Sequence, residues 1–295
     1  MTARPAAPST RVTAMRFGMN LLLWTTHVTP EHERQLAFVK ECGFDGVEIP
    51  LFEGDPDHFA AVGEMCDGLG LQRTCSAGLA PEHDPIHEDP AVRQAALARL
   101  RWAIDCAEAA GADVLCGPLH SAFKVFRDRG PNDEEVQRSA DVLRQAAEHA
   151  EPAGVLLAPE ALNRFECYLV NTAAQMRALV EAVDHPYLKA HYDTHHMHLE
   201  ERDAAAAVAH TAPVLGHVHF SENDRGVPGR GQVDWQGTFA ALRDSGYDGW
   251  CVIEAFSRLD PEFAAGIHVW RDYFAAPEDV CREGLAFVKQ GLAGR

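Results

Sequence analysis

The stretch LKAHYDTHHMHLEERDAAAAVAHTAPVLGHVHF, residues 188–220, contains the pattern that decides the fold. It begins with a short apolar run that ends at Asp193 and finishes with a second run at 216–220, and an amphipathic segment lies between them. Short apolar runs of this length are consistent with buried strands. The stretch therefore predicts one strand–helix–strand unit, which needs about 30 residues.

The same unit recurs along the chain. Eight apolar runs are each followed by an amphipathic segment, and successive runs begin 26 to 43 residues apart. The expected strands are 16–23, 46–50, 72–77, 112–117, 155–160, 188–193, 216–220 and 250–254. Eight alternating units predict a single α/β domain, a (β/α)8 TIM barrel over residues 16–295, with its active site at the C-terminal ends of the strands.

Local signals support the barrel against its rival, a doubly wound open sheet. That rival usually carries a glycine-rich phosphate loop after its first strand, and none follows Leu23. Helices are expected to begin at Thr29-Pro30, Asp89-Pro90, Asn132-Asp133 and Asn171-Thr172. Helices are expected to end at Gly43, Gly70, Gly111, Gly154 and Gly246, because glycine readily adopts the left-handed backbone found there.

Composition excludes several classes of function. The chain of 295 residues has 26 Lys and Arg against 44 Asp and Glu, a net charge of −18. This excess of acid argues against nucleic acid and anionic membranes as partners. No apolar run is long enough to span a membrane, and residues 1–15 lack the apolar stretch of a signal peptide. We expect residues 1–15 to be a disordered extension, the protein to be cytoplasmic, and its eight cysteines to be reduced.

Polar residues at the ends of the last four expected strands form a second pattern. Glu160, Asp193 and Glu254 each end a strand, and His219 lies near the end of the seventh. In a barrel these side chains would meet at the mouth, where a shared cation would compensate the cost of burying them. Three carboxylates and one imidazole favour Mn²⁺, Mg²⁺ or Co²⁺ over structural zinc. Ion pairing with Arg or Lys of the barrel is the alternative.

Neighbouring histidines receive different interpretations. We expect His196 to contact substrate, whereas His195 and His198 are expected to be solvated loop residues. His217 shares a strand face with His219, so it should lie one layer deeper and hydrogen-bond to the site.

Several motifs resemble the ketose 3-epimerase family, which includes the D-tagatose and D-psicose 3-epimerases within the xylose isomerase-like barrels. The resemblance covers nearly the whole chain from Arg16 onward. The motifs are EALNRFE at 160–166, DTHHM at 193–197, GHVHFSENDR at 216–225, PGRG at 228–231, GYDG at 246–249 together with Glu254, and VWRD at 269–272.

The resemblance implies a role for each matching position. The four mouth residues, Glu160, Asp193, His219 and Glu254, would bind a divalent metal, usually manganese, and the two glutamates would also be the acid/base pair. Three further residues would contact the sugar around O1 and O2: Glu166, His196 and Arg225. The resemblance also implies a homodimer or a homotetramer.

The residues around C4 to C6 of the sugar depart from the family pattern. These segments, 19–24, 74–77 and 116–123, vary among relatives and leave the identity of the ketose open. Trp24 is a candidate wall for stacking on the sugar, with packing in the core as its alternative.

The chemistry explains why two glutamates are needed. Inverting C3 of a ketose removes a proton from one face and returns one to the other, so two acid/base groups must face the carbon. A cation beside the C2 carbonyl stabilises the enediolate, and Arg225 can add a positive charge there. The resemblance thus implies C3 epimerisation of free ketoses such as D-tagatose or the pair D-fructose and D-psicose.

Other functions remain alternatives. An aldose–ketose isomerase, or a metal-assisted cleavage of 3-keto glycosides, could use the same scaffold. The net charge of −18 opposes a DNA-repair endonuclease, and the intact glutamate pair opposes a protein that only binds sugars. A phosphorylated substrate is disfavoured because no glycine-rich phosphate cradle follows the last two strands, although 229–231 is a weak candidate for one.

Overall fold

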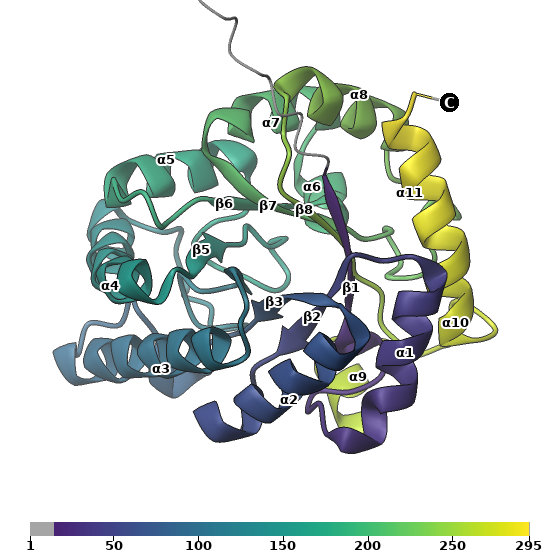
Figure 1. Ribbon diagram of the computed structural model, residues 1–295. Helices are drawn as coiled ribbons and strands as arrows, with labels where there is room; N and C mark the ends of the chain where they lie inside the picture. The colour runs from purple at the N-terminus through teal and green to yellow at the C-terminus, as the bar shows by residue number, and fades with distance from the viewer. Residues whose placement is uncertain (1–14, 295) are drawn as a thin grey trace, which may run out of the picture.

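Eight parallel strands form the centre of the molecule and helices surround them (Figure 1). The computed structural model describes residues 15–294, so all of the expected N-terminal extension except Met15 lies outside the described residues. The strands are β1 Arg16–Asn20, β2 Gly46–Pro50, β3 Gln72–Ser76, β4 Val114–Gly117, β5 Leu156–Pro159, β6 Ala190–Asp193, β7 Leu215–Phe220 and β8 Trp250–Ile253. Each predicted strand is present, and the predicted TIM barrel is confirmed.

The strand order closes the barrel. Hydrogen-bonded neighbours run β5-β4-β3-β2-β1-β8-β7-β6. Single parallel bridges, Leu157 with Leu188 and Glu160 with His191, join β5 to the segment of β6. The C-terminal ends of β5 to β8 therefore lie next to one another at one end of the barrel, as the sequence spacing predicts.

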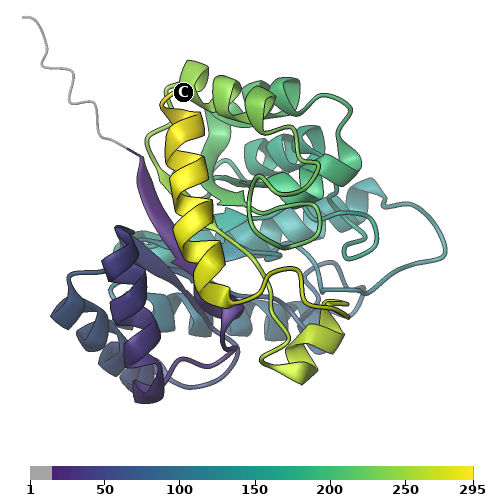
Figure 2. The same ribbon diagram turned by 90° about the vertical axis from the view of Figure 1, so that its right-hand side faces the viewer.

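Helices follow the strands in alternation. They are α1 Glu33–Cys42, α2 Pro56–Leu69, α3 Pro90–Ala109, α4 Asp133–Ala153, α5 Ala173–Val183, α6 Thr194–Glu200, α7 Ala204–Thr211, α8 Trp235–Ser245, α9 Pro261–Gly266, α10 Pro277–Asp279 and α11 Leu285–Leu292. A π-helical turn, Val280–Gly284, joins α10 to α11. Helix α11 lies between α1 and α8 in the outer ring, and Figure 2 shows it beside β1. In the described part of the chain, none of the helices could cross a membrane.

Helix ends follow the expected local chemistry. The Asn132 side chain accepts a hydrogen bond from the backbone N–H of Glu135, and Thr172 rather than Asn171 does the same for α5. Gly43, Gly70, Gly154 and Gly246 end their helices with left-handed backbone, and Gly111 has a positive φ one residue after α3 is capped. All eight cysteines are free thiols.

One expected strand is shorter than its apolar run. The run 16–23 forms β1 only as far as Asn20, and Leu21–Leu23 forms a 3-10 turn. The Asn20 side chain accepts a hydrogen bond of 2.8 Å from the Leu22 N–H, which ends the strand there. This turn leaves the Asn20 amide inside the barrel, where it is completely buried.

The inside of the barrel is filled in layers. Trp250 is fully buried at the start of β8, and its indole N–H donates to Asp113 at 2.8 Å. Gly46 makes room for it, because a Cβ there would lie 2.6 Å from the Trp250 ring and 2.3 Å from a backbone oxygen. His217 pairs in register with Trp250, and His219 lies two residues further along β7. The layers therefore rise from an apolar base through His217 to the C-terminal mouth.

Candidate active site

A cleft of about 580 Å³ opens at the C-terminal ends of the strands. Its charged and polar lining includes six of the expected site residues: Glu160, Glu166, His196, His219, Arg225 and Glu254. Apolar side chains, among them Leu22, Phe52, Leu79, Phe123 and Phe256, make up much of the remainder. The cleft thus combines one polar end with an apolar wall, as ligand sites commonly do.

Asp193 lies at the point where β6 passes directly into α6. Its Oδ1 accepts a hydrogen bond of 3.0 Å from the backbone N–H of His196 and so caps the helix. Its Oδ2 lies 3.7 Å from Nδ1 of His219 and 3.4 Å from Nη1 of Arg225. The helix cap leaves one oxygen of this buried carboxylate facing the site.

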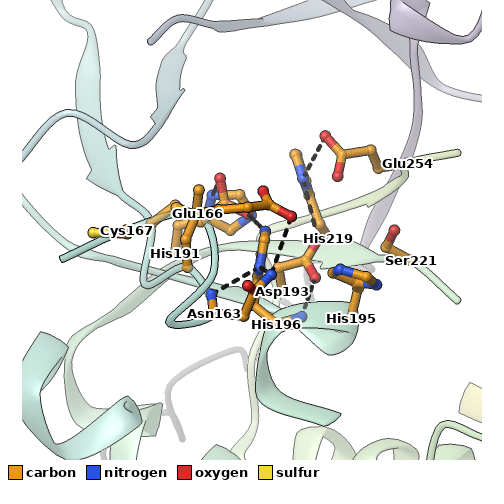
Figure 3. Close-up of polar contacts among 12 residues, drawn as sticks. Asn163, Glu166, Cys167, His191, Asp193, His195, His196, His219, Ser221 and Glu254 are labelled. Carbon is orange, nitrogen blue, oxygen red and sulfur yellow. Dashed lines mark hydrogen bonds and ion pairs between the residues drawn. The ribbon is translucent and has the colours of Figure 1, made fainter. Parts of the chain in front are cut away.

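His219 lies between two carboxylates. Its Nδ1 is 3.4 Å from Oε1 of Glu254 and makes no hydrogen bond, although the ring is almost fully buried. In Figure 3 the His219 ring faces Glu254, with Asp193 close by. One ligand atom from each of Asp193, His219 and Glu254 lies within 4.8 Å of the others.

Glu160 directly follows β5 and lies next to the same group. Its backbone N–H continues the sheet by donating to Gly117 at 2.8 Å, which aims the side chain into the cleft. Its Oε1 has no hydrogen-bond partner and lies 3.6 Å from Nε2 of His196. Glu160, Asp193 and His196 form a second close group that adjoins the first at Asp193.

Burial and neighbouring charges shift the pKa values of the three carboxylates in different directions. Burial, with the nearby charge of Asp193, raises the pKa of Glu160 well above its usual range. Burial also raises the pKa of Asp193, to about 6, against the opposing effect of Arg225. Burial acts in the same direction on Glu254, but Arg225 and His219 outweigh it and lower its pKa. A single guanidinium therefore balances this group only in part.

The other expected residues surround the same space. Arg225 donates to Glu254 at 2.5 Å and to Ser221 at 2.8 Å, and its Nη2 lies 2.9 Å from Nε2 of His196. Arg225 has a positive φ of 65°, which non-glycine residues seldom adopt and which marks a position held by its surroundings. Glu166 lines the cleft and accepts a hydrogen bond of 3.1 Å from Asn163.

This donor set could hold a divalent cation. One guanidinium against three carboxylates leaves two negative charges uncompensated when all are ionised. Among the buried atoms of the described residues that have no hydrogen-bond partner, Oε1 of Glu160 and Nδ1 of His219 belong to this group. Buried polar atoms in native proteins are nearly always paired, so these atoms indicate a missing partner of positive charge. Oxygen-rich donors with one imidazole suit Mn²⁺ or Mg²⁺.

A second carboxylate–imidazole group lies beneath the first and was not anticipated from the sequence. Glu48 of β2 is fully buried within hydrogen-bond distance of both His217 and His219. His217 is one layer deeper, as expected. The available clue was an acid in the middle of an otherwise apolar strand, GVEIP at 46–50. Asn163, which contacts both His196 and Glu166, was also missed.

The prediction for His195 is wrong, because residues 194–200 form helix α6 instead of a loop. His195 is only 8 % exposed, and its Nδ1 donates to the backbone oxygen of Glu222 at 3.2 Å. His198 is exposed, as expected, but it too lies in helix α6 and not in a loop. Trp24 is half-buried and packs against the hydrophobic core, and it is not among the residues that line the cleft. Its stacking on a sugar stays a prediction.

Known proteins match this chain over most of its length. The xylose isomerase-like TIM barrel family matches residues 36–290. A ketose 3-epimerase from Arthrobacter globiformis is 34% identical, over 94% of this chain and 97% of its own length. An L-ribulose 3-epimerase from Mesorhizobium japonicum is 32% identical over 94% of each chain.

A solved structure gives the same result in three dimensions. A D-allulose 3-epimerase from Methylomonas sp., in complex with D-allulose, superimposes with a TM-score of 0.88 at 30% identity, over 94% of this chain and 97% of that one. The resemblance inferred from the motifs is thereby confirmed, and the chain belongs to the xylose isomerase-like TIM barrel family, where it groups with the ketose 3-epimerases.

Proposed function

We propose that this protein is a metal-dependent epimerase that inverts C3 of free ketoses. Relatives named ketose 3-epimerase and L-ribulose 3-epimerase, and a structural neighbour that holds D-allulose, support this class of substrate. D-Tagatose, D-fructose, D-psicose and related ketoses are the candidates. In this proposal Glu160, Asp193, His219 and Glu254 hold the cation, with Mn²⁺ as the first choice and Co²⁺ or Mg²⁺ as alternatives.

The observation that carries the proposal is the pair of carboxylates, Glu160 and Glu254, facing one cleft. They follow β5 and β8, which are separated by β6 and β7, so they reach the cleft from different sides. A protein that merely bound a sugar or a cation would not need a second buried acid. An epimerase needs one, because C3 must lose a proton on one face and gain a proton on the other.

The reaction can be written for this chain's own residues. One glutamate accepts the C3 proton, and the electron pair of the C–H bond moves toward the C2 carbonyl to form an enediolate. The other glutamate, protonated beforehand, donates its proton to the opposite face of C3, so the carbonyl is restored with inverted configuration. When bound, the cation supplies Lewis-acid stabilisation to the negative charge on the sugar oxygens.

In this proposal, His196, Arg225 and Glu166 orient the sugar. The backbone N–H of Asn163 donates to Nδ1 of His196 at 3.0 Å, and Nη2 of Arg225, which can only donate, lies 2.9 Å from Nε2 of the same ring at the cleft. The Arg225 guanidinium can donate to sugar oxygens near C2, the His196 ring can contact them, and Glu166 can accept from a hydroxyl. These contacts would position C2 and C3 of a ketose beside the two glutamates.

Exchange of hydrogen at C3 tests the proposal directly. D-Tagatose, D-fructose and L-ribulose are incubated with the protein and Mn²⁺ in D₂O, and deuterium at C3 is followed by NMR while products are separated by chromatography. The expected result is deuterium at C3 together with the C3 epimer. An aldose product would instead identify an aldose–ketose isomerase, and the absence of exchange with every ketose would refute the proposal.

The expected assembly is part of the same proposal. The family resemblance supports a homodimer or a homotetramer, and size-exclusion chromatography with light scattering distinguishes these from a monomer.

A further inference from the structure

Glu48 lies at the centre of a buried hydrogen-bond network that links five strands. Its Oε1 accepts from Asn20 at 2.9 Å and from His219 at 2.7 Å. Its Oε2 accepts from Thr74 and His217, each at 2.9 Å, and from Cys116 at 3.2 Å. We name these residues the Glu48 hub: Asn20, Glu48, Thr74, Cys116, His217 and His219.

The hub determines which nitrogen of His219 carries a proton. An ionised carboxylate can only accept hydrogen bonds, so Nε2 of His219, 2.7 Å from Glu48, must donate. In the neutral ring, Nδ1 then carries no proton and has a free lone pair. That nitrogen faces Asp193 at 3.7 Å and Glu254 at 3.4 Å, with no hydrogen bond of its own.

The hub reaches a second residue of the mouth. The Asn20 amide group donates one hydrogen to Glu48 and lies 3.2 Å from Oε1 of Glu254, to which it donates the other. Its oxygen accepts from the Leu22 N–H, which fixes the orientation of the amide. Glu48 is thus connected to two of the four proposed ligands, directly to His219 and through Asn20 to Glu254.

We propose that Glu48 is a positioning residue that holds the proton of His219 on Nε2, keeps Nδ1 turned toward the mouth, and through Asn20 orients Glu254. This inference rests on the proposed function, in which His219 and Glu254 are metal ligands. Carboxylates that hydrogen-bond to a ligating histidine fix its tautomer and orientation, and their loss commonly weakens metal binding by about 10- to 100-fold. Glu48 itself does not line the cleft, so it acts through its neighbours.

Nitrogen NMR of the unmodified chain tests the proton position without any substitution at Glu48. Protein labelled with ¹⁵N-histidine is recorded metal-free and with Mg²⁺, which is diamagnetic, and the His219 signals are assigned by their absence from His219→Gln. We expect a slowly exchanging proton on Nε2 of His219 in both samples. An unprotonated Nε2 in either sample would overturn the proposal.

Mn²⁺ affinity tests the consequence. Glu48→Gln keeps the size of the side chain but replaces one acceptor oxygen with an NH₂ group, so the hub can no longer accept all five donors. Calorimetry should show a Kd for Mn²⁺ about 10- to 100-fold higher than that of the native chain. Thr74→Val is the matched control, because it removes one donor from Glu48 and leaves both histidines paired. Its Kd should stay close to the native value.

The two measurements separate this inference from the proposed function. An unchanged Kd in a folded Glu48→Gln variant would overturn the role of Glu48, whatever the enzyme's activity. If the native chain bound no Mn²⁺, the proposed metal site would fail, and the Nε2 signal would still decide whether Glu48 holds the His219 proton. If Glu48→Gln did not fold, the NMR measurement on the native chain would decide alone.

Discussion

The mouth cluster (Glu160, Asp193, His219 and Glu254) and the Glu48 hub use the same kinds of side chain in adjacent layers of one barrel. Both are buried, and His219 belongs to both. In the hub, one carboxylate receives five donors. In the mouth, three carboxylates have only one guanidinium beside them and leave an oxygen and a ring nitrogen without partners. The number of hydrogen-bond donors for each carboxylate distinguishes a structural acid from one that is free to bind a cation or transfer a proton.

The electrostatics of the two groups follow from that number. Burial alone would raise the pKa of Glu48, but its electrostatic interactions and hydrogen bonds with His219 and His217 outweigh burial and hold the pKa well below its usual range. For Glu160, burial and the charge of Asp193 act together and raise the pKa. Similar burial therefore produces opposite outcomes, because only one of the two carboxylates is surrounded by donors.

The largest expected effect is the loss of catalysis when the mouth acids are neutralised. Glu160→Gln and Glu254→Gln should each lower the rate of C3 deuterium exchange by about 10²- to 10⁴-fold, because each removes one of the two proton-transfer groups. The exchange assay in D₂O measures this, and Glu181→Gln on the exposed side of α5 is the control. Full exchange activity in either mouth variant would remove that residue from the mechanism.

Removing one acid from each group should affect the stability of the protein differently. Glu48→Ala leaves five buried donors without their acceptor and should lower the free energy of unfolding by about 3–5 kcal/mol. Glu160→Ala removes an acid whose Oε1 is unpartnered and should leave the stability of the metal-free protein unchanged or increased. Urea denaturation in the presence of a chelator compares them. Equal losses in both variants would contradict the distinction between hub and mouth.

Mn²⁺ should raise the free energy of unfolding by binding at the mouth cluster and at no other site. At a free concentration 100 times its Kd, a ligand specific for the native state adds about 2.7 kcal/mol to the free energy of unfolding. The gain should be reversed by EDTA, absent in Asp193→Asn, and retained in the hub variant Thr74→Val. Thermal denaturation with and without Mn²⁺ measures it. Undiminished stabilisation in Asp193→Asn would place the cation elsewhere.

Glu135, a buried carboxylate that belongs to neither group, should give the smallest effect. Burial raises the pKa of Glu135, but hydrogen bonds from Arg129, the Asn132 backbone and Tyr168 outweigh it and lower the pKa. A lowered pKa means that the stabilisation is complete above the ordinary glutamate pKa of about 4.3 and disappears as the pH falls through the lower native value.

The corresponding experiment is a pH series of unfolding free energies for Glu135→Gln and the native chain. Because Arg129 is half-exposed, water screens the ion pair, and we expect a difference of about 1 kcal/mol at pH 7. The difference should shrink below pH 4. A difference that grew toward acid pH would reverse the sign and contradict the assignment.

The local sequence pattern was sufficient to predict the fold and the proximity of the mouth residues. The alternation of apolar runs with capped amphipathic segments is set by nearest neighbours in the chain, so all eight strands were predictable within a few residues. The proximity of Asp193, His219 and Glu254 followed from barrel geometry, because consecutive parallel strands end at the same edge. His195 was misplaced because nothing in the spacing shows that α6 begins directly after β6.

The sequence by itself determined the barrel, its order of strands and which acids reach the mouth. Only the tertiary structure decided which buried acid is saturated and which is left short of donors. Glu48 meets His219 across 171 residues, and Asn20 meets Glu254 across 234. A strand period shows that a side chain points inward, but the number of donors around it depends on strands from the whole chain. The number of donors distinguishes Glu48, a structural carboxylate, from the carboxylates of the mouth.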